Sequence, residues 1–157
     1  MAEKTIAVVG VGNVLMGDDG AGPAALEELR KAGAEDKADL INAGKAFHAV
    51  VFDLEKYEKV IIIDAVKGKG SPGALYRFDL AELRGKDRLD SAGVSVHELS
   101  VLKTLLFQEM YQGKFRNVVF IGVQPAKVTW TEGLSDTLKK AMPNLVQAVL
   151  KEICRQQ

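Results

Sequence analysis

Three residues carry the side-chain types that bind a divalent metal ion or activate water: Asp19, Asp64 and His97. Asp19 ends an acidic pair that follows an apolar run and a glycine turn, and Asp64 ends the run 59–64 (KVIIID). Two carboxylates and one imidazole suit a borderline ion, such as zinc or nickel, that keeps open coordination positions. Water bound at an open position can become a nucleophile near neutral pH, so the set is compatible with metal-assisted hydrolysis.

Each of these residues also has an ordinary structural explanation. An aspartate after a strand can cap the next segment, and a histidine near a helix start is more often a surface residue than a ligand. Asp18 could assist the chemistry or be only a loop carboxylate. Ser95 and Glu98 fit a capping box, which predicts that His97 lies in the first turn of a helix. A helix N-terminus disfavours the imidazolium and keeps the ring able to bind a metal.

The elements that would position these residues alternate between apolar runs and amphipathic segments. The four consecutive apolar residues 60–63 indicate that 59–64 is a strand buried on both faces. Alternating strands and helices predict an α/β domain with helices on both faces of one sheet, and ligands of such sheets bind beyond the carboxyl ends of the strands. We expect strands at 5–9, 39–42, 59–64, 75–78 and 117–123, and helices at 23–31, 50–56, 95–113 and 136–154, the last capped by Ser135. Residues 79–91 are too polar to assign.

Composition limits the classes of protein to consider. The 157 residues suit a single domain over 1–157. The 21 basic and 21 acidic residues cancel, so no overall field favours nucleic acid or an anionic membrane. The first apolar run is too short for a signal peptide, and the single cysteine, Cys154, excludes an internal disulfide. We expect a cytoplasmic protein without nucleic-acid or membrane partners. We also expect a monomer, because no long apolar stripe is left unexplained.

Several common motifs are absent from the sequence. The third glycine of a dinucleotide-binding G-x-G-x-x-G would fall at Leu15, which argues against a nucleotide-binding regulatory domain. The sequence contains no Walker motif, no G-x-S-x-G elbow and no H-E-x-x-H. We therefore expect no organic cofactor and no serine-hydrolase mechanism.

Four segments together resemble the hydrogenase maturation proteases. The stretch 10–22 (GVGNVLMGDDGAG) resembles the opening signature of that family: G-x-G-N, a short apolar spacer, an acidic pair and a glycine. IIIDAV around Asp64, SVHELS around His97 and GVQP at 122–125 resemble its later landmarks, in the same order. The resemblance implies a three-layer α/β sandwich with a mixed, mostly parallel central sheet and helices on both faces.

The resemblance also implies an activity. Members of the family are endopeptidases that remove the C-terminal extension of a nickel–iron hydrogenase large-subunit precursor after nickel insertion. The residues that match the family's catalytic and metal-contacting positions are Asp19, Asp64 and His97. The nickel is supplied by the substrate and serves recognition and catalysis. The family commonly has glutamate where this chain has the shorter Asp19, so the distance to the metal is expected to differ.

A second departure concerns the segment that is implicated in recognising the precursor. Many members read D-G-G-T or D-A-G-T there, whereas this chain reads NAGK at 42–45. This departure from the family's pattern indicates a divergent substrate. The residues it assigns to substrate binding, including those that shape the receiving loops, are Gly12, Asn13, Asn42, Gly44 and Lys45.

Two alternatives to this activity stay open at the level of sequence. The same metal-contacting residues would serve a nickel-binding hydrogenase accessory module without peptidase activity. The departure at 42–45 also leaves room for a peptidase of the same fold that acts on another protein.

Overall fold

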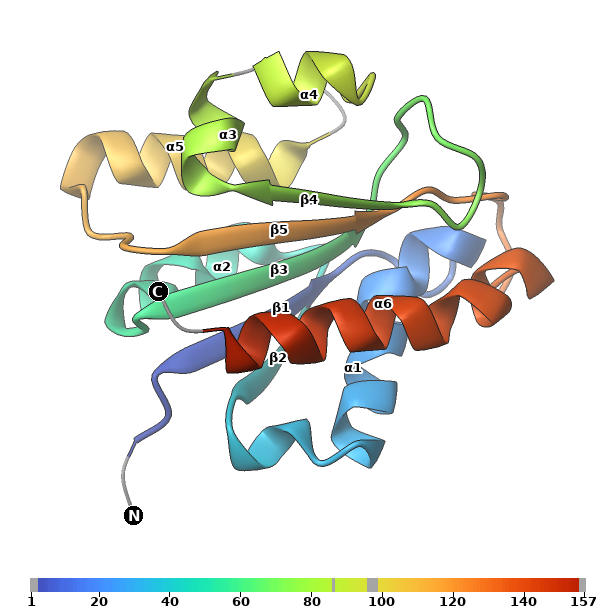
Figure 1. The fold of residues 1–157 in the computed structure, drawn as a ribbon, viewed down its shortest axis with the longest axis horizontal. Helices are drawn as coiled ribbons and strands as arrows, with labels where there is room; N and C mark the ends of the chain where they lie inside the picture. The colour runs from blue at the N-terminus through green and yellow to red at the C-terminus, as the bar shows by residue number, and fades with distance from the viewer. Residues whose placement is uncertain (1–2, 86, 96–98, 156–157) are drawn as a thin grey trace.

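The computed structural model describes residues 3–85, 87–95 and 99–155. In this part of the chain five strands form one sheet in the order β2-β1-β3-β5-β4 (Figure 1). All neighbouring strands are parallel except β4, which runs antiparallel to β5 at one edge. The predicted mixed, mostly parallel sheet is therefore confirmed. The strands are β1 (Ile6–Val11), β2 (Asp39–Gly44), β3 (Lys59–Ala65), β4 (Leu75–Asp79) and β5 (Val118–Val123).

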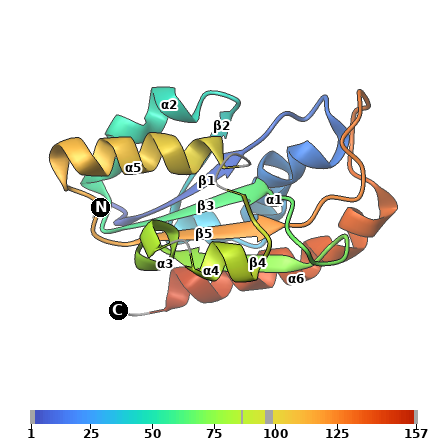
Figure 2. The same cartoon turned by 90° about the horizontal axis from the view of Figure 1, so that it is seen from above.

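Helices cover both faces of this sheet, which confirms the three-layer sandwich. Helices α1 (Ala21–Lys31) and α6 (Asp136–Cys154) lie on one face. Helix α5 (Ser100–Gln112) lies on the other, with α2 (Phe47–Val50) and the 3-10 helix η3 (Val51–Lys56) (Figure 2). Two short helices, α3 (Leu80–Gly85) and α4 (Asp87–Ser91), pack against the same core as α5.

The central strands are buried on both faces, as the sequence predicts. Along β3, Ile61 and Ile63 face the core under α1 and α6, whereas Val60 and Ile62 face the core under α5. Side chains of a strand point alternately to opposite faces, so only a strand covered on both sides reads as a continuous apolar run.

Two helical expectations need correction. Helix α5 begins at Ser100, and the side chain of its N-cap residue, Leu99, forms no capping hydrogen bond. The predicted start at Ser95 is therefore wrong. Residues 79–91, which the sequence leaves unassigned, contain α3 and α4. The expected cap of α6 is confirmed, because the Ser135 hydroxyl accepts a hydrogen bond from the Leu138 amide at 3.3 Å.

None of the helices in the described ranges combines the length and the apolar character that crossing a bilayer would require. The carboxyl ends of β1, β3 and β5 meet at one edge of the sheet, which is the right-hand end in Figure 1. The segment that follows β1 and the carboxyl end of β3 carry the candidate site at this edge.

Candidate active site

The two predicted acids come together at the carboxyl edge of the sheet. Asp64 is the penultimate residue of β3, and Asp19 lies in the 3-10 helix η1 (Gly17–Gly20) that follows β1. Gly12 lies close to both residues: a Cβ built on it would be 1.8 Å from the backbone carbonyl oxygen of Asp19 and 3.7 Å from Oδ1 of Asp64. Gly12 also has a φ of +136°, which strongly favours glycine. Only glycine allows the chain to pass this close to the backbone of Asp19.

The electrostatics of this pair are unusual for a protein surface. Burial, and then the charge of Asp19, raise the pKa of Asp64 well above its ordinary value, although a backbone hydrogen bond from Ala65 opposes the shift. Asp19 Oδ2 accepts a hydrogen bond from the Asn13 amide at 2.8 Å. Within the described part of the chain, neither acid forms an ion pair with a lysine or arginine. The pair is therefore a place where a cation would be favourable.

His97, the third predicted ligand, lies outside the described residues. Its proposed role as a metal ligand therefore stays a prediction from the sequence. The residues that the structure describes hold no group of three or more His, Cys, Asp and Glu side chains that could bind a metal ion. Of the predicted set, the structure thus brings together Asp19 and Asp64.

Asp18, the neighbour of Asp19, turns inward and holds two loops together. It is fully buried, and its carboxylate accepts hydrogen bonds from the backbone amides of Ala126, Lys127 and Ser135 and from the Ser135 hydroxyl, at 2.7–2.9 Å. Burial alone would raise the pKa of Asp18, but these hydrogen bonds outweigh it and lower the pKa. Asp18 is therefore a structural anchor of the site. Sequence reasoning missed this role, because its partners lie more than a hundred residues away.

The residues assigned to substrate binding surround the same edge. The Gly12 amide donates to the Gly44 carbonyl at 2.8 Å, which ties the end of β1 to the end of β2. Asn42 Oδ1 accepts from the Gly44 amide at 3.0 Å, and Gly44 has a φ of +54°. Asn42 lines a hollow of about 330 Å³ together with Val14. Lys45, the residue that follows β2, is exposed.

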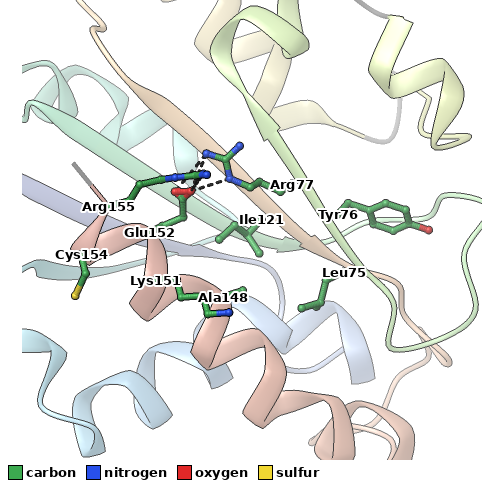
Figure 3. Close-up of a pocket in the computed structure, with 9 residues that line it drawn as sticks. All are labelled: Leu75, Tyr76, Arg77, Ile121, Ala148, Lys151, Glu152, Cys154 and Arg155. Carbon is green, nitrogen blue, oxygen red and sulfur yellow. Dashed lines mark hydrogen bonds and ion pairs between the residues drawn. The ribbon is translucent and has the colours of Figure 1, made fainter. Parts of the chain in front are cut away.

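A different pocket, of about 550 Å³, lies between β4 and the end of α6 (Figure 3). Arg77 and Arg155 line it, and both pair with the Glu152 carboxylate. None of the predicted site residues that the structure describes lines this pocket. The carboxyl edge is the better candidate for the chemistry.

Known proteins match this chain along nearly its whole length. The family model described as hydrogenase maturation protease matches residues 23–152. The delta subunit of coenzyme F420 hydrogenase from Methanothermobacter thermautotrophicus is 35% identical, over 96% of this chain and 96% of that protein.

Two solved structures share the fold. The hydrogenase 2 maturation peptidase from Thaumarchaeota archaeon SCGC_AB-539-E09 is 35% identical with a TM-score of 0.72, over 96% of this chain and 98% of that one. The hydrogenase-maturating endopeptidase HybD from Escherichia coli is 25% identical with a TM-score of 0.78, over 95% of this chain and 91% of that one. The segments that carry the resemblance, the sandwich fold and these matches agree, and the chain belongs to the hydrogenase maturation protease family.

Proposed function

We propose that this protein removes the C-terminal extension of a nickel–iron hydrogenase large-subunit precursor after nickel insertion. The observation that carries the proposal is the meeting of Asp19 and Asp64 at the carboxyl edge, without a cationic partner among the described residues. Two acids in this state favour a bound cation, and a precursor that carries nickel brings one. The family and the maturation peptidases that match the chain support the peptidase activity.

In this proposal Asp19, Asp64 and His97 contact the nickel of the precursor. The nickel belongs to the substrate, and an empty precursor lacks the ion that these side chains require. The scissile peptide bond is then held beside a metal ion, where water can be activated near neutral pH. Holding the reacting groups together supplies a large part of the acceleration. Gly12, Asn13, Asn42, Gly44 and Lys45 receive the extended C-terminal peptide.

A second candidate is a hydrogenase accessory protein that binds nickel but cleaves nothing. One observation favours it: a relative that is 35% identical is named as a hydrogenase subunit. Both candidates use the same edge of the sheet. They differ in whether the precursor loses mass.

The test is intact-mass spectrometry of the source organism's large-subunit precursors, nickel-loaded and nickel-free, after incubation with this protein. We expect one nickel-loaded precursor to lose a C-terminal peptide and its nickel-free form to stay intact. The variant His97→Ala should no longer cleave the precursor, whereas His48→Ala, at the other histidine, should still cleave it. Stable binding of a loaded precursor that keeps its full mass would favour the accessory protein. Normal cleavage by His97→Ala would rule out the role of His97.

A further inference from the structure

Exposed apolar side chains gather on the two loops that follow β1 and β5. Val14 and Leu15 are 47% and 51% exposed, and Val128 and Trp130 are 38% and 79% exposed. We call these four residues the loop apolar surface. A soluble protein exposes single apolar side chains freely, but several on adjacent loops, with a tryptophan among them, are typical of a binding surface.

Hydrogen bonds join the two loops that carry these side chains. The Gly17 amide donates to the Thr131 carbonyl at 2.8 Å, and the Thr131 amide donates to the Leu15 carbonyl at 3.1 Å. The Asp18 amide adds a bond to the Lys127 carbonyl at 2.9 Å, and its buried carboxylate ties the same loop from within. Figure 2 shows the two loops rising side by side beyond the sheet. Two loops that are already joined lose less backbone conformational entropy on binding.

The loop apolar surface adjoins the candidate active site. The Asp19 amide donates to the Met16 carbonyl at 3.2 Å, and the Asn13 amide donates to the Asp19 carboxylate. Val14 and Leu15 thus lie within the same short loop as the backbone groups that fix Asp19. A folded substrate that brings its scissile bond to Asp19 must approach these side chains.

We propose that the loop apolar surface, with Trp130 as its central contact, docks the folded body of the large-subunit precursor. This inference rests on the proposed function and adds the surface that selects the precursor. The chain has another exposed apolar group, Phe107, Met110 and Tyr111 on α5. That group belongs to the end of α5 that leads to the amino end of β5, at the opposite edge of the sheet from Asp19. It provides a matched control.

The test uses the single tryptophan of the chain. Protein labelled with fluorotryptophan gives one fluorine NMR signal, from Trp130. We expect this signal to shift when the nickel-loaded precursor that the wild-type protein cleaves is added. Trp130→Ala should raise KM for that precursor about tenfold or more and leave kcat nearly unchanged, because the lost contact acts in binding. Leu15→Ser should act in the same direction, whereas Tyr111→Ala should leave both constants unchanged.

The possible outcomes separate the inference from the proposed function. If the wild-type protein cleaves no loaded precursor, the proposed function fails and this inference fails with it. If cleavage occurs but the fluorine signal stays fixed and KM is unchanged in Trp130→Ala, only the docking surface is wrong. If the signal shifts with the protein's own concentration and not with the precursor, the surface joins two copies of this chain, and the inference is overturned.

Discussion

Asp64 occupies a position that serves a cation better than it serves the stability of the fold. It is the acid that ends the apolar strand β3, and Asp19 is close enough to act on its charge. The ionised carboxylate is disfavoured by burial and by a like charge, and no lysine or arginine in the described ranges pairs with it. A residue selected only for stability would not be charged here, and functional sites commonly show this conflict.

A first prediction follows for Asp64→Asn. Because the pKa of Asp64 is raised in the folded state, its contribution to stability is fully present below the unfolded-state pKa and is lost as pH rises through the folded-state value. Removing the charge should therefore increase the free energy of unfolding at neutral pH, by on the order of 1 kcal/mol. The same change should abolish precursor cleavage. Urea denaturation at pH 5 and pH 8 measures the first effect, which should be larger at pH 8.

The control for this prediction is Asp36→Asn, which removes an exposed carboxylate from the 3-10 helix η2 (Ala34–Asp36). It should change neither the stability difference between the two pH values nor the cleavage. A loss of stability in Asp64→Asn at pH 8 would show that the ionised carboxylate is stabilised by the fold, contrary to the direction of its pKa shift.

At the scale of elements, two adjacent aspartates act on different parts of the molecule. The 3-10 geometry of η1 turns Asp19 toward Asp64 at the sheet edge and Asp18 toward the N-terminus of α6. The Asp18 carboxylate reinforces the cap of α6 by binding both the amide and the hydroxyl of Ser135. A carboxylate near a helix N-terminus is also favoured by the helix dipole. One short element thus links the candidate site to the packing of α6.

Asp18→Asn and Asp19→Asn should therefore separate stability from activity. In Asp18→Asn, an NH2 group replaces one of the two carboxylate oxygens that accept hydrogen bonds. The buried donors that face this NH2 group lose their acceptor, and leaving such groups unsatisfied costs about 1–3 kcal/mol. Because the pKa of Asp18 is lowered, its contribution is present above the unfolded-state pKa and is lost as pH falls through the folded-state value. Asp18→Asn should thus flatten the acid side of the stability profile, measured by thermal unfolding between pH 3 and pH 7. Asp19→Asn should abolish cleavage at little cost in stability. Lost cleavage with full stability in Asp18→Asn, together with lost stability and normal cleavage in Asp19→Asn, would contradict both assignments.

The sequence predicts the elements whose signals are local. Continuous apolar runs predict the buried strands, and Ser135 marks the start of α6, because strand burial and capping depend on neighbouring residues. The capping-box signature at Ser95 gives a wrong start for α5, which begins at Ser100, because tertiary packing as well as a short local pattern sets a helix boundary. Helices α3 and α4 escape prediction because one turn or two of polar sequence has little periodicity. The anchoring role of Asp18 depends on a contact between distant segments, which no local pattern reveals.

At the scale of the whole molecule, β3 has an ionisable residue near each end, and the surroundings of these two residues differ. At the carboxyl end, Asp64 has no cationic partner among the described residues. At the amino end, Lys59 is only 5% exposed, and its Nζ donates to the Glu152 carbonyl at 2.6 Å and lies 3.4 Å from the Glu152 carboxylate. The guanidinium of Arg77, on β4, also pairs with the Glu152 carboxylate, at a distance of 2.7 Å (Figure 3). Burial would raise the pKa of Glu152, but Arg77 and Lys59 lower it.

This cluster joins β3, β4 and the end of α6, far along β3 from the candidate site, so its loss should affect stability and leave the chemistry intact. Glu152→Leu leaves the buried Lys59 ammonium without its carboxylate, and breaking a buried pair in this way costs about 3–5 kcal/mol. The backbone carbonyl at position 152 still accepts from Lys59, which favours the lower end of that range.

Lys59→Met combined with Glu152→Leu should recover much of the loss, since apolar side chains can replace a buried ion pair. Urea denaturation measures both changes, and cleavage per folded molecule should stay at the wild-type rate. A double variant no more stable than Glu152→Leu would contradict the uncompensated charge as the cause, and a slowed cleavage would show that the two ends of β3 are coupled.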